Sequence, residues 1–136
     1  MSQNKQIGEV AHELEISPKT IRYYEEMGLI SPSRHPESGY RLYAQADIDR
    51  LAFILRSREL DFSLSHISQI LALRDAGEAP CQYVTARITQ QLATIEARIA
   101  VLTNLHHELT AIQQQANAIP QLSIATNGSV CHLIEN

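Results

Sequence analysis

The sequence predicts a mainly helical fold with one small β-hairpin and one long helix toward the C-terminus. Apolar residues recur at three- and four-residue spacing through much of the first 76 residues. A short stretch around Gly39 alternates as a hairpin does, and no Gly or Pro occurs between Cys81 and Ala116. We therefore expect a first domain over residues 1–76, a long helix over 81–118 and a C-terminal loop over 119–136.

Two short helices open the chain. The segment 6–14 has one apolar face, formed by Ile7, Val10, Ala11 and Leu14. The segment 15–17 breaks this helix, and Ser17 followed by Pro18 is a typical start for the next one. This second helix is expected to end near Met27, because Gly28 is a typical terminator. Two short helices joined by a tight turn predict a helix-turn-helix.

A hairpin over residues 36–43 and two further helices complete the first domain. The third helix, over 46–60, is expected to turn Ile48, Leu51, Ala52 and Leu55 inward. Ser63 caps the fourth helix, over 64–76, whose inward residues are expected to be Ile67, Ile70 and Leu71. A hairpin beside a helix-turn-helix predicts a winged helix-turn-helix.

The long helix carries an apolar seam with alternating spacings of four and three residues. Its members are Ile88, Leu92, Ile95, Ile99, Leu102, His106 and Leu109. Such a heptad pattern is typical of a coiled coil, and one helix cannot bury the stripe by itself. A second copy of the same helix is the simplest partner, so a homodimer is expected. An intramolecular bundle is the alternative, and the spacing does not decide between parallel and antiparallel pairing.

The charged residues neither clearly indicate nor exclude nucleic-acid binding. The net charge of −4 does not by itself indicate a nucleic-acid binder. Eight of the eleven Lys and Arg lie within residues 1–60, but nine acidic residues lie there too. A DNA-binding surface would therefore have to be a local basic face.

The second helix and the hairpin carry the candidate DNA-binding residues. Lys19, Thr20, Arg22 and Tyr23 lie near the start of the helix that would enter the major groove. One of the adjacent Tyr23 and Tyr24 must pack inward. An ordinary charged helix surface is the alternative interpretation. In the hairpin, Tyr40 and Arg41 suit contacts to phosphate, and Arg34, Arg56 and Arg58 are candidates to extend the contact.

From about residue 5 to 116, the chain resembles the MerR family of transcription regulators. The most specific pieces are TIRYYEEMGLI, SGYRLY and DFSLSHI. The family usually has Leu-Gly-Phe before the fourth helix, where this chain has Leu60-Asp61-Phe62. The departure is small and leaves the capping residue Ser63 in place.

The resemblance implies a dimeric regulator and no enzyme. It implies a winged helix-turn-helix with linker helices over 1–76, an antiparallel coiled coil over 81–118 and an effector loop over 119–136. The dimer would bind double-stranded promoter DNA and bend and untwist it, so that RNA polymerase engages the same promoter. The residues implied in DNA binding are Ser17, Lys19, Thr20, Arg22, Tyr23, Tyr40, Arg41 and Arg58.

The short effector region is similar to that of the metal-sensing branch. The resemblance implies that Cys81 of one subunit and Cys131 of the other share a divalent thiophilic ion, of the zinc, cadmium, lead or mercury type. A further loop Cys usual in that branch is absent, since residues 121–123 read Gln-Leu-Ser. His132 and His107, or His106, are candidates to complete the site. The bland alternative is a seam position for His106 and solvated side chains for the other two.

Other functions remain open at this point. A thiol-based sensor of oxidants or electrophiles is the main alternative, because a helix N-terminus at Cys81 favours the thiolate. A small organic effector, or none, is a further possibility. A metal buffer would not need a basic hairpin, and an enzyme would need an orienting group that the sequence does not show. No signal peptide and no membrane span is recognisable, so we expect a cytoplasmic protein with reduced cysteines.

Overall fold

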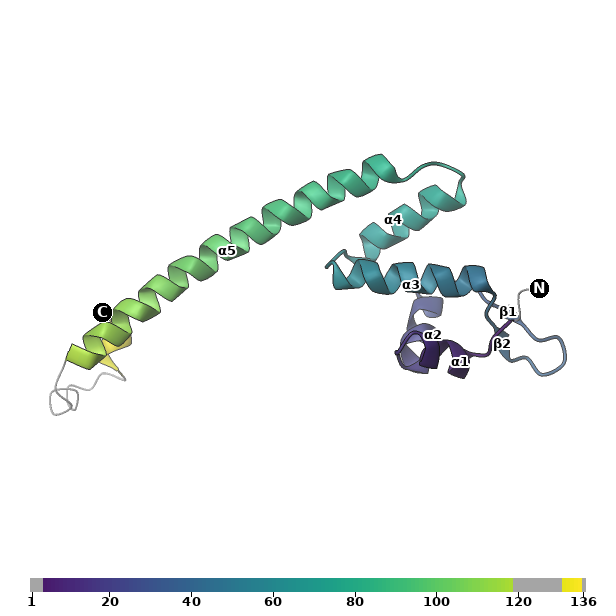
Figure 1. The fold of residues 1–136 in the computed structure, drawn as a ribbon, viewed down its shortest axis with the longest axis horizontal. Coiled ribbons are helices and arrows are strands. Elements are labelled where there is room, and N and C mark those ends of the chain that lie inside the picture. The colour runs from purple at the N-terminus through teal and green to yellow at the C-terminus, as the bar shows by residue number, and fades with distance from the viewer. Residues whose placement is uncertain (1–3, 119–130, 136) are drawn as a thin grey trace. The chain divides into compact units, whose positions relative to one another are not determined.

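The computed structural model describes residues 4–118 and 131–135 and has the predicted mainly helical fold (Figure 1). The elements are α1 (Ile7–Glu13), α2 (Pro18–Glu26), β1 (Ser33–Arg34), β2 (Arg41–Leu42), α3 (Gln45–Glu59), α4 (Leu64–Asp75), α5 (Cys81–Ala118) and α6 (His132–Glu135). The chain divides into two compact units, Met1–Ile88 and Thr89–Asn136.

The turn between α1 and α2 follows the expected local chemistry. Glu15 takes a positive φ of 57°, which ends α1 and reverses the chain. The Ser17 Oγ then accepts the backbone N–H of Thr20 at 3.2 Å, and Pro18 occupies the first turn of α2. Gly28 follows the helix with a φ of 78°, a conformation that costs a glycine little. The predicted helix-turn-helix is confirmed.

One apolar core joins α1, α2, the hairpin, α3 and α4. It is formed by Val10, Ala11, Ile21, Tyr24, Leu29, Ile30, Tyr43, Ile48, Leu51, Ile54, Phe62, Ile67 and Leu71. In Figure 1, α3 lies above α1 and α2, and its core residues link them to α4. The inward residues predicted for α4 are confirmed, since Ile67, Ile70 and Leu71 are all buried.

The inward face predicted for α3 is partly wrong. Ile48 and Leu51 are buried as expected, but Ala52 is exposed and Leu55 is only half-buried. Ile54 is fully buried instead. Steps of three residues therefore describe the buried ridge of α3, which continues to Ser57. The helix turns its larger side chains to the core, because burying Ile54 removes more apolar surface from water than burying Ala52.

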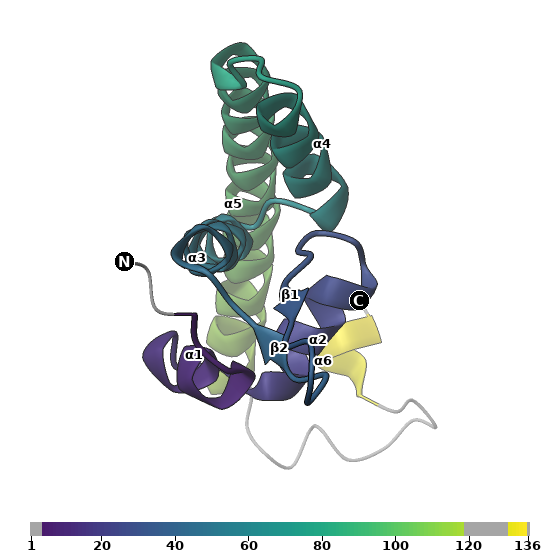
Figure 2. The ribbon, with the colours of Figure 1, turned by 90° about the vertical axis from the view of Figure 1, so that its right-hand side faces the viewer.

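Each strand of the hairpin has only two residues, and the loop that joins them, over residues 35–40, is longer. Ser33 pairs with Leu42 and Arg34 with Arg41 in an antiparallel register. An isolated bridge between Lys5 and Tyr43 connects the N-terminal segment to the end of the hairpin. Figure 2 shows the hairpin beside α2, as a winged helix-turn-helix requires.

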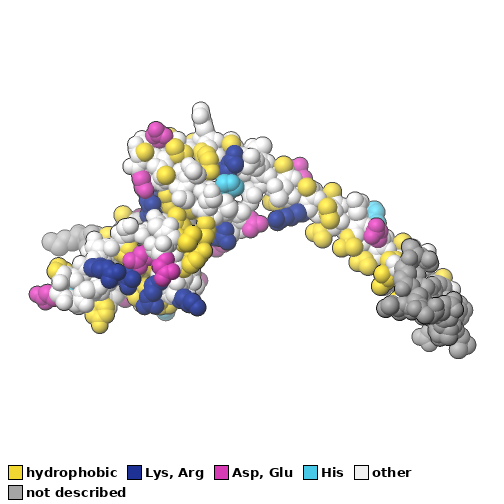
Figure 3. All heavy atoms as spheres, turned by 180° about the vertical axis from the view of Figure 1, so that it is seen from behind, with side chains coloured by type: hydrophobic (Ala, Val, Ile, Leu, Met, Phe, Trp, Pro, Cys, Tyr) yellow, Lys and Arg dark blue, Asp and Glu magenta, His cyan; other side chains and the backbone are white. Residues whose placement is uncertain are grey.

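The long helix α5 spans 38 residues and buries none of them. The six aliphatic members of the predicted seam expose between 45% and 62% of their surface. Hydrophobic side chains recur along this helix in Figure 3. The one-turn helix α6 begins directly after Cys131. Among the helices in the described part of the chain, none is long and apolar enough to cross a membrane.

Candidate nucleic-acid interface and effector residues

The exposed face of α2 carries most of the candidate DNA-binding residues. Lys19 and Arg22 are exposed, and Tyr23 exposes 46% of its surface. Tyr24 is buried in the core with its ring 5.5 Å from that of Tyr23. The two neighbouring tyrosines therefore divide as expected, one anchoring α2 and the other facing outward.

The start of α2 is organised by two hydroxyl groups. The Oγ of Ser17 and the Oγ1 of Thr20 lie 2.9 Å apart, and the Ser17 hydroxyl also caps the helix. The partial positive charge of a helix N-terminus favours phosphate, and hydroxyl groups are common phosphate partners. Ser17, Lys19 and Thr20 thus form a start of α2 that suits a DNA backbone.

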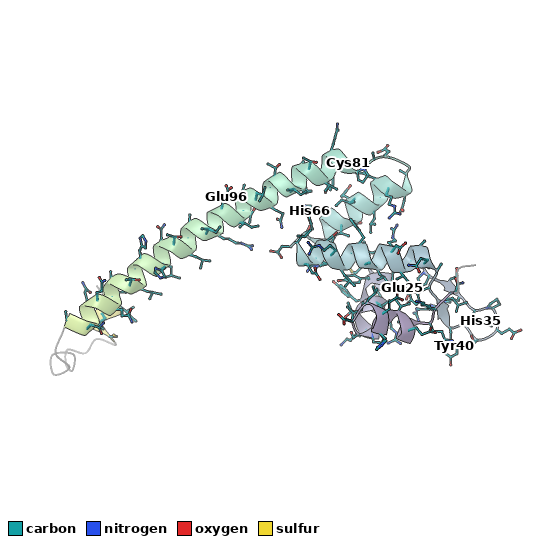
Figure 4. The ribbon with its side chains drawn as sticks, viewed as in Figure 1. Glu25, His35, Tyr40, His66, Cys81 and Glu96 are labelled. Atoms are coloured by element: carbon teal, nitrogen blue, oxygen red, sulfur yellow. The ribbon has the colours of Figure 1, made fainter. Side chains whose placement is uncertain are left out.

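In the hairpin, Tyr40 and Arg41 lie in different surroundings. Tyr40 is 65% exposed at the end of the loop, and Figure 4 shows it pointing away from the rest of the hairpin. Arg41 is half-buried, and its Nε donates to the carboxylate of Glu25 in α2. The hairpin is therefore tied to α2 by an ion pair. The sequence carries no local sign of this contact, because its partners lie 16 residues apart on different elements.

Arg58 has a local structural contact at the end of α3. Its Nη1 donates to the carbonyl oxygen of Phe62 at 2.9 Å, across the turn into α4. The turn needs support, since Asp61 has a positive φ of 68°. The neighbouring Arg56 pairs with Glu59 at 3.0 Å. A DNA contact of Arg58 stays a prediction.

A second arginine contact that sequence reasoning missed joins three segments of the first unit. Arg50 of α3 donates from Nε to the carbonyl oxygen of Leu29 at 2.6 Å. Its two terminal nitrogens donate to the Asp75 carboxylate at 2.8 and 3.0 Å, in a bidentate pair at the end of α4. The hydrogen bonds from Arg50 lower the pKa of Asp75 below its ordinary value of 3.8. These contacts fix the segment after α2 against α3 and α4.

The two cysteines lie in different units, as free thiols. Cys81 is exposed at the first residue of α5, where Figure 4 labels it. Cys131 is half-buried and directly precedes α6. Within the described residues of one chain, no three His, Cys, Asp or Glu side chains gather where they would hold an ion.

The candidate histidines are only partly described. His106 and His107 are exposed on α5, with ring centroids 6.4 Å apart. The side chain of His132 and residues 121–123, where the usual loop Cys is missing, lie outside the described part of the structure. The assignment of any histidine to a metal site stays a prediction.

Comparison with known proteins gives consistent matches. The model of the MerR HTH family regulatory protein matches residues 6–73, and the MerR, DNA binding model matches residues 48–112. The HTH-type transcriptional regulator ZntR of Escherichia coli (strain K12) is 39% identical over 104 residues, which are 76% of this chain and 74% of that protein.

Two further similarities concern proteins whose names or descriptions refer to metals. The probable heavy metal-dependent transcriptional regulator of Haemophilus influenzae is 42% identical over 103 residues, covering 76% of this chain and 80% of that protein. The crystal structure of the transcription regulator PbrR691 from Ralstonia metallidurans CH34 in complex with lead(II) superposes with a TM-score of 0.75. It has 29% sequence identity and covers 96% of this chain and 97% of that one.

Proposed function

The chain belongs to the MerR family of helix-turn-helix DNA-binding transcription regulators, and from that premise we propose that it is a homodimer that switches a promoter in response to a thiophilic divalent metal ion. Like its relatives it is a regulator and not an enzyme. The observation that carries the proposal is the combination of an exposed polar α2 face with a hairpin that is tied to that helix by Arg41 and Glu25.

The DNA-binding surface consists of α2 and the hairpin. We assign Arg22 to a base edge or phosphate in the major groove, and Lys19 and Tyr23 to the backbone. Ser17 and Thr20 place the helix start against a phosphate. Tyr40 and Arg41 extend the contact from the hairpin, and Arg58 from the end of α3. Because Glu25 holds Arg41, the two DNA-contacting elements approach the duplex as one body.

The dimer forms through α5. The seam residues expose about half of their surface in the single chain, which supports a partner helix along this face. In the antiparallel arrangement that the family implies, each Cys81 lies near the C-terminal part of the other subunit. The operator would then be read by two copies of the first unit, and the same bound dimer would deform the promoter so that RNA polymerase engages it.

The donor chemistry fits a thiophilic ion shared between subunits. Two thiolates, from Cys81 and Cys131, are soft donors that favour mercury, lead, cadmium or zinc over magnesium or calcium. Zinc would need further ligands to complete four, and His107 and His132 are the candidates. When bound, the ion would link Cys131 of one subunit to Cys81 of the other. Relatives described as heavy metal-dependent and as bound to lead(II) support this assignment.

Metal binding is tested by titrating the reduced protein with each ion against a chromophoric chelator. We expect one or two ions per dimer, and loss of tight binding in both Cys81→Ser and Cys131→Ser. His12→Gln, which removes an exposed histidine from α1, is the matched control. If no ion competes with the chelator, the metal assignment fails.

A thiol-based switch is the competing proposal, and the exposure of Cys81 at the first residue of a long helix favours it. Mass spectrometry of the protein after treatment with an electrophile separates the two. Modification of Cys81 that alters DNA binding, in a protein that binds no ion, would establish the thiol switch in place of metal sensing.

Arg22→Ala tests the DNA assignment. We expect specific binding to be lost, because a charged contact in the major groove carries sequence discrimination. The probe is a duplex selected by the wild-type protein from a random library, and the readout is fluorescence anisotropy. Arg74→Ala, which removes an exposed arginine from α4, is the control. The dimer should persist in size-exclusion chromatography.

Tyr40→Ala should behave differently from Arg22→Ala. Its proposed partner is the phosphate backbone, so binding should weaken to a similar extent on selected and random duplexes. Unchanged affinity of Arg22→Ala for the selected duplex would contradict the assignment of α2 as the recognition helix.

A further inference from the structure

One residue, His35, bonds to much of the loop between β1 and β2 through its side chain and its backbone. Its imidazole Nδ1 accepts the backbone N–H of Glu37 at 3.2 Å and that of Ser38 at 3.3 Å. The backbone carbonyl oxygen of His35 accepts the N–H of Gly39 at 2.9 Å. The N–H of Tyr40 donates to the Ser38 Oγ at 3.4 Å. His35 therefore accepts three of the four backbone N–H groups between residues 37 and 40.

Tyr40 stands at the end of this bonded loop. The backbone N–H of His35 donates to the carbonyl oxygen of Tyr40 at 2.7 Å and closes the loop. Pro36 has a fixed φ, and Gly39 reverses the chain with a φ of 73°. Figure 4 labels His35 and Tyr40 within this hairpin. The loop is exposed and has no apolar core of its own, so without these acceptors its backbone would exchange its bonds with water.

We propose that neutral His35 is a positioning residue for DNA binding, holding the hairpin loop in the conformation that presents Tyr40 to the phosphate backbone. The inference rests on the proposed DNA-binding function. His35 acts through Tyr40. The role requires an acceptor at the Nδ1 position, and therefore the neutral ring with its proton on Nε2.

The chemistry of the loop supplies a matched pair of variants. Asparagine places its Oδ1 as many bonds from the backbone as the imidazole Nδ1, and asparagine side chains commonly accept backbone N–H groups in turns of this kind. Glutamine places its amide one bond further out, where the imidazole has Nε2. His35→Asn should therefore keep the two side-chain bonds to the N–H groups of Glu37 and Ser38, and His35→Gln should lose them, while both variants keep the backbone bonds to Gly39 and Tyr40.

The test measures binding to a fluorescent random-sequence duplex of about 30 base pairs, roughly three helical turns, by anisotropy at low salt. We expect His35→Asn to bind as the wild type does, and His35→Gln to bind about 3- to 10-fold more weakly, the usual effect of losing a side-chain cap. Thermal melting, followed by circular dichroism, establishes that both variants fold. His12→Gln controls for the loss of an exposed histidine.

A second measurement separates positioning from a general effect on the fold. In a Tyr40→Ala background, His35→Gln should cause no further loss of affinity, because its proposed effect passes through Tyr40. Equal affinity of His35→Gln and the wild type, equal weakness of the Asn and Gln variants, or additive losses with Tyr40→Ala would each overturn the inference. Failure of the wild type to bind any duplex would instead overturn the proposed function.

Discussion

The Tyr43 side chain is fully buried in the core of the first unit, and its hydroxyl has no hydrogen-bond partner among the described residues. A buried hydroxyl without a partner destabilises the folded state, because it gives up its bonds to water. We expect Tyr43→Phe to raise the free energy of unfolding by up to about 1 kcal/mol. Urea denaturation at neutral pH measures this change, with Tyr40→Phe as the exposed control.

Burial of Tyr43 also makes the stability of the protein depend on pH. It raises the pKa of Tyr43 above 10.0, and the nearby Glu25 adds to the effect. The unfolded chain then releases the phenol proton before the folded one does, so stability falls as the pH rises above 10. Tyr43→Phe should lack this part of the alkaline loss. A marked destabilisation of Tyr43→Phe at neutral pH would show that the hydroxyl has a bonding partner.

The pairing of Asp75 with Arg50 predicts a pH dependence at the acid end. Because the hydrogen bonds from Arg50 lower the pKa of Asp75 in the folded state, its stabilising effect is present above the ordinary value of 3.8. It is lost as the pH falls through the lowered value. Asp75→Asn should therefore be less stable than the wild type near neutral pH, and the difference should shrink in acid.

Urea midpoints measured from about pH 7 to about pH 2.5 test this expectation. Asp49→Asn, which changes an exposed carboxylate of α3, is the matched control. A difference between Asp75→Asn and the wild type that stays constant over this pH range would show that the carboxylate has no such role.

At the scale of elements, the apolar seam of α5 is the face that most needs a partner. Ile99, in the middle of the seam, is 56% exposed in the single chain. Ile99→Lys places a charge in the proposed interface twice per dimer. We expect the dimer dissociation constant to rise by at least about a hundredfold, as measured by analytical ultracentrifugation.

Asn104→Lys provides the control for this change. Asn104 lies on α5 off the seam, so the same charge there should leave the dimer intact. If Ile99→Lys stays dimeric, the seam is not the dimer interface. If both variants dissociate, charge on the helix explains the result better than position.

Elements with a local signal could be predicted from the sequence. The sequence indicates that Ser17 caps α2, that Gly28 follows it and that one of two adjacent tyrosines packs inward, because these features depend on residues a few positions away. The structure shows that Tyr24 is the buried one. The inward face of α3 could be predicted only in part, since Ile54 is buried by several elements at once. Periodicity within one helix does not show which neighbours it will have.

The candidate site divides in the same way. The exposed residues of α2 and Tyr40 could be predicted because sequence alone places them on a helix face and a turn. The Glu25–Arg41 pair and the three bonds of Arg50 could not, since their partners lie on separate elements. The loop bonds to His35 carried no local signal either, because histidine is not among the residues typical of turns.

For the whole molecule, the proposed metal site makes a prediction about subunit mixing. A dimer that pairs one Cys81→Ser subunit with one Cys131→Ser subunit contains a single complete pair of cysteines only if the pair spans two subunits. We expect this mixed dimer to bind one ion tightly, while neither parent variant binds any. Differently tagged subunits, coexpressed and purified through both tags, allow the titration.

The two outcomes have distinct meanings. Binding in the mixed dimer requires thiolates from different chains. A mixed dimer that binds nothing, formed from subunits whose wild type does bind, would place both thiolates of a site in the same chain.

Arg50 has a mechanical consequence for the first unit. Its guanidinium connects α3 both to the carbonyl oxygen of Leu29, in the segment that follows α2, and to Asp75, the last residue of α4. The planar guanidinium of arginine holds its three hydrogen bonds in fixed directions. The ammonium group of a lysine, on its flexible stem, would allow these groups to rotate. Arg50 therefore restrains the end of α4 and the segment after α2 relative to each other. A rotation of the end of α4 would then be passed on to α2. Arg50→Lys would keep these helices in place but weaken the mechanical coupling between α4 and α2.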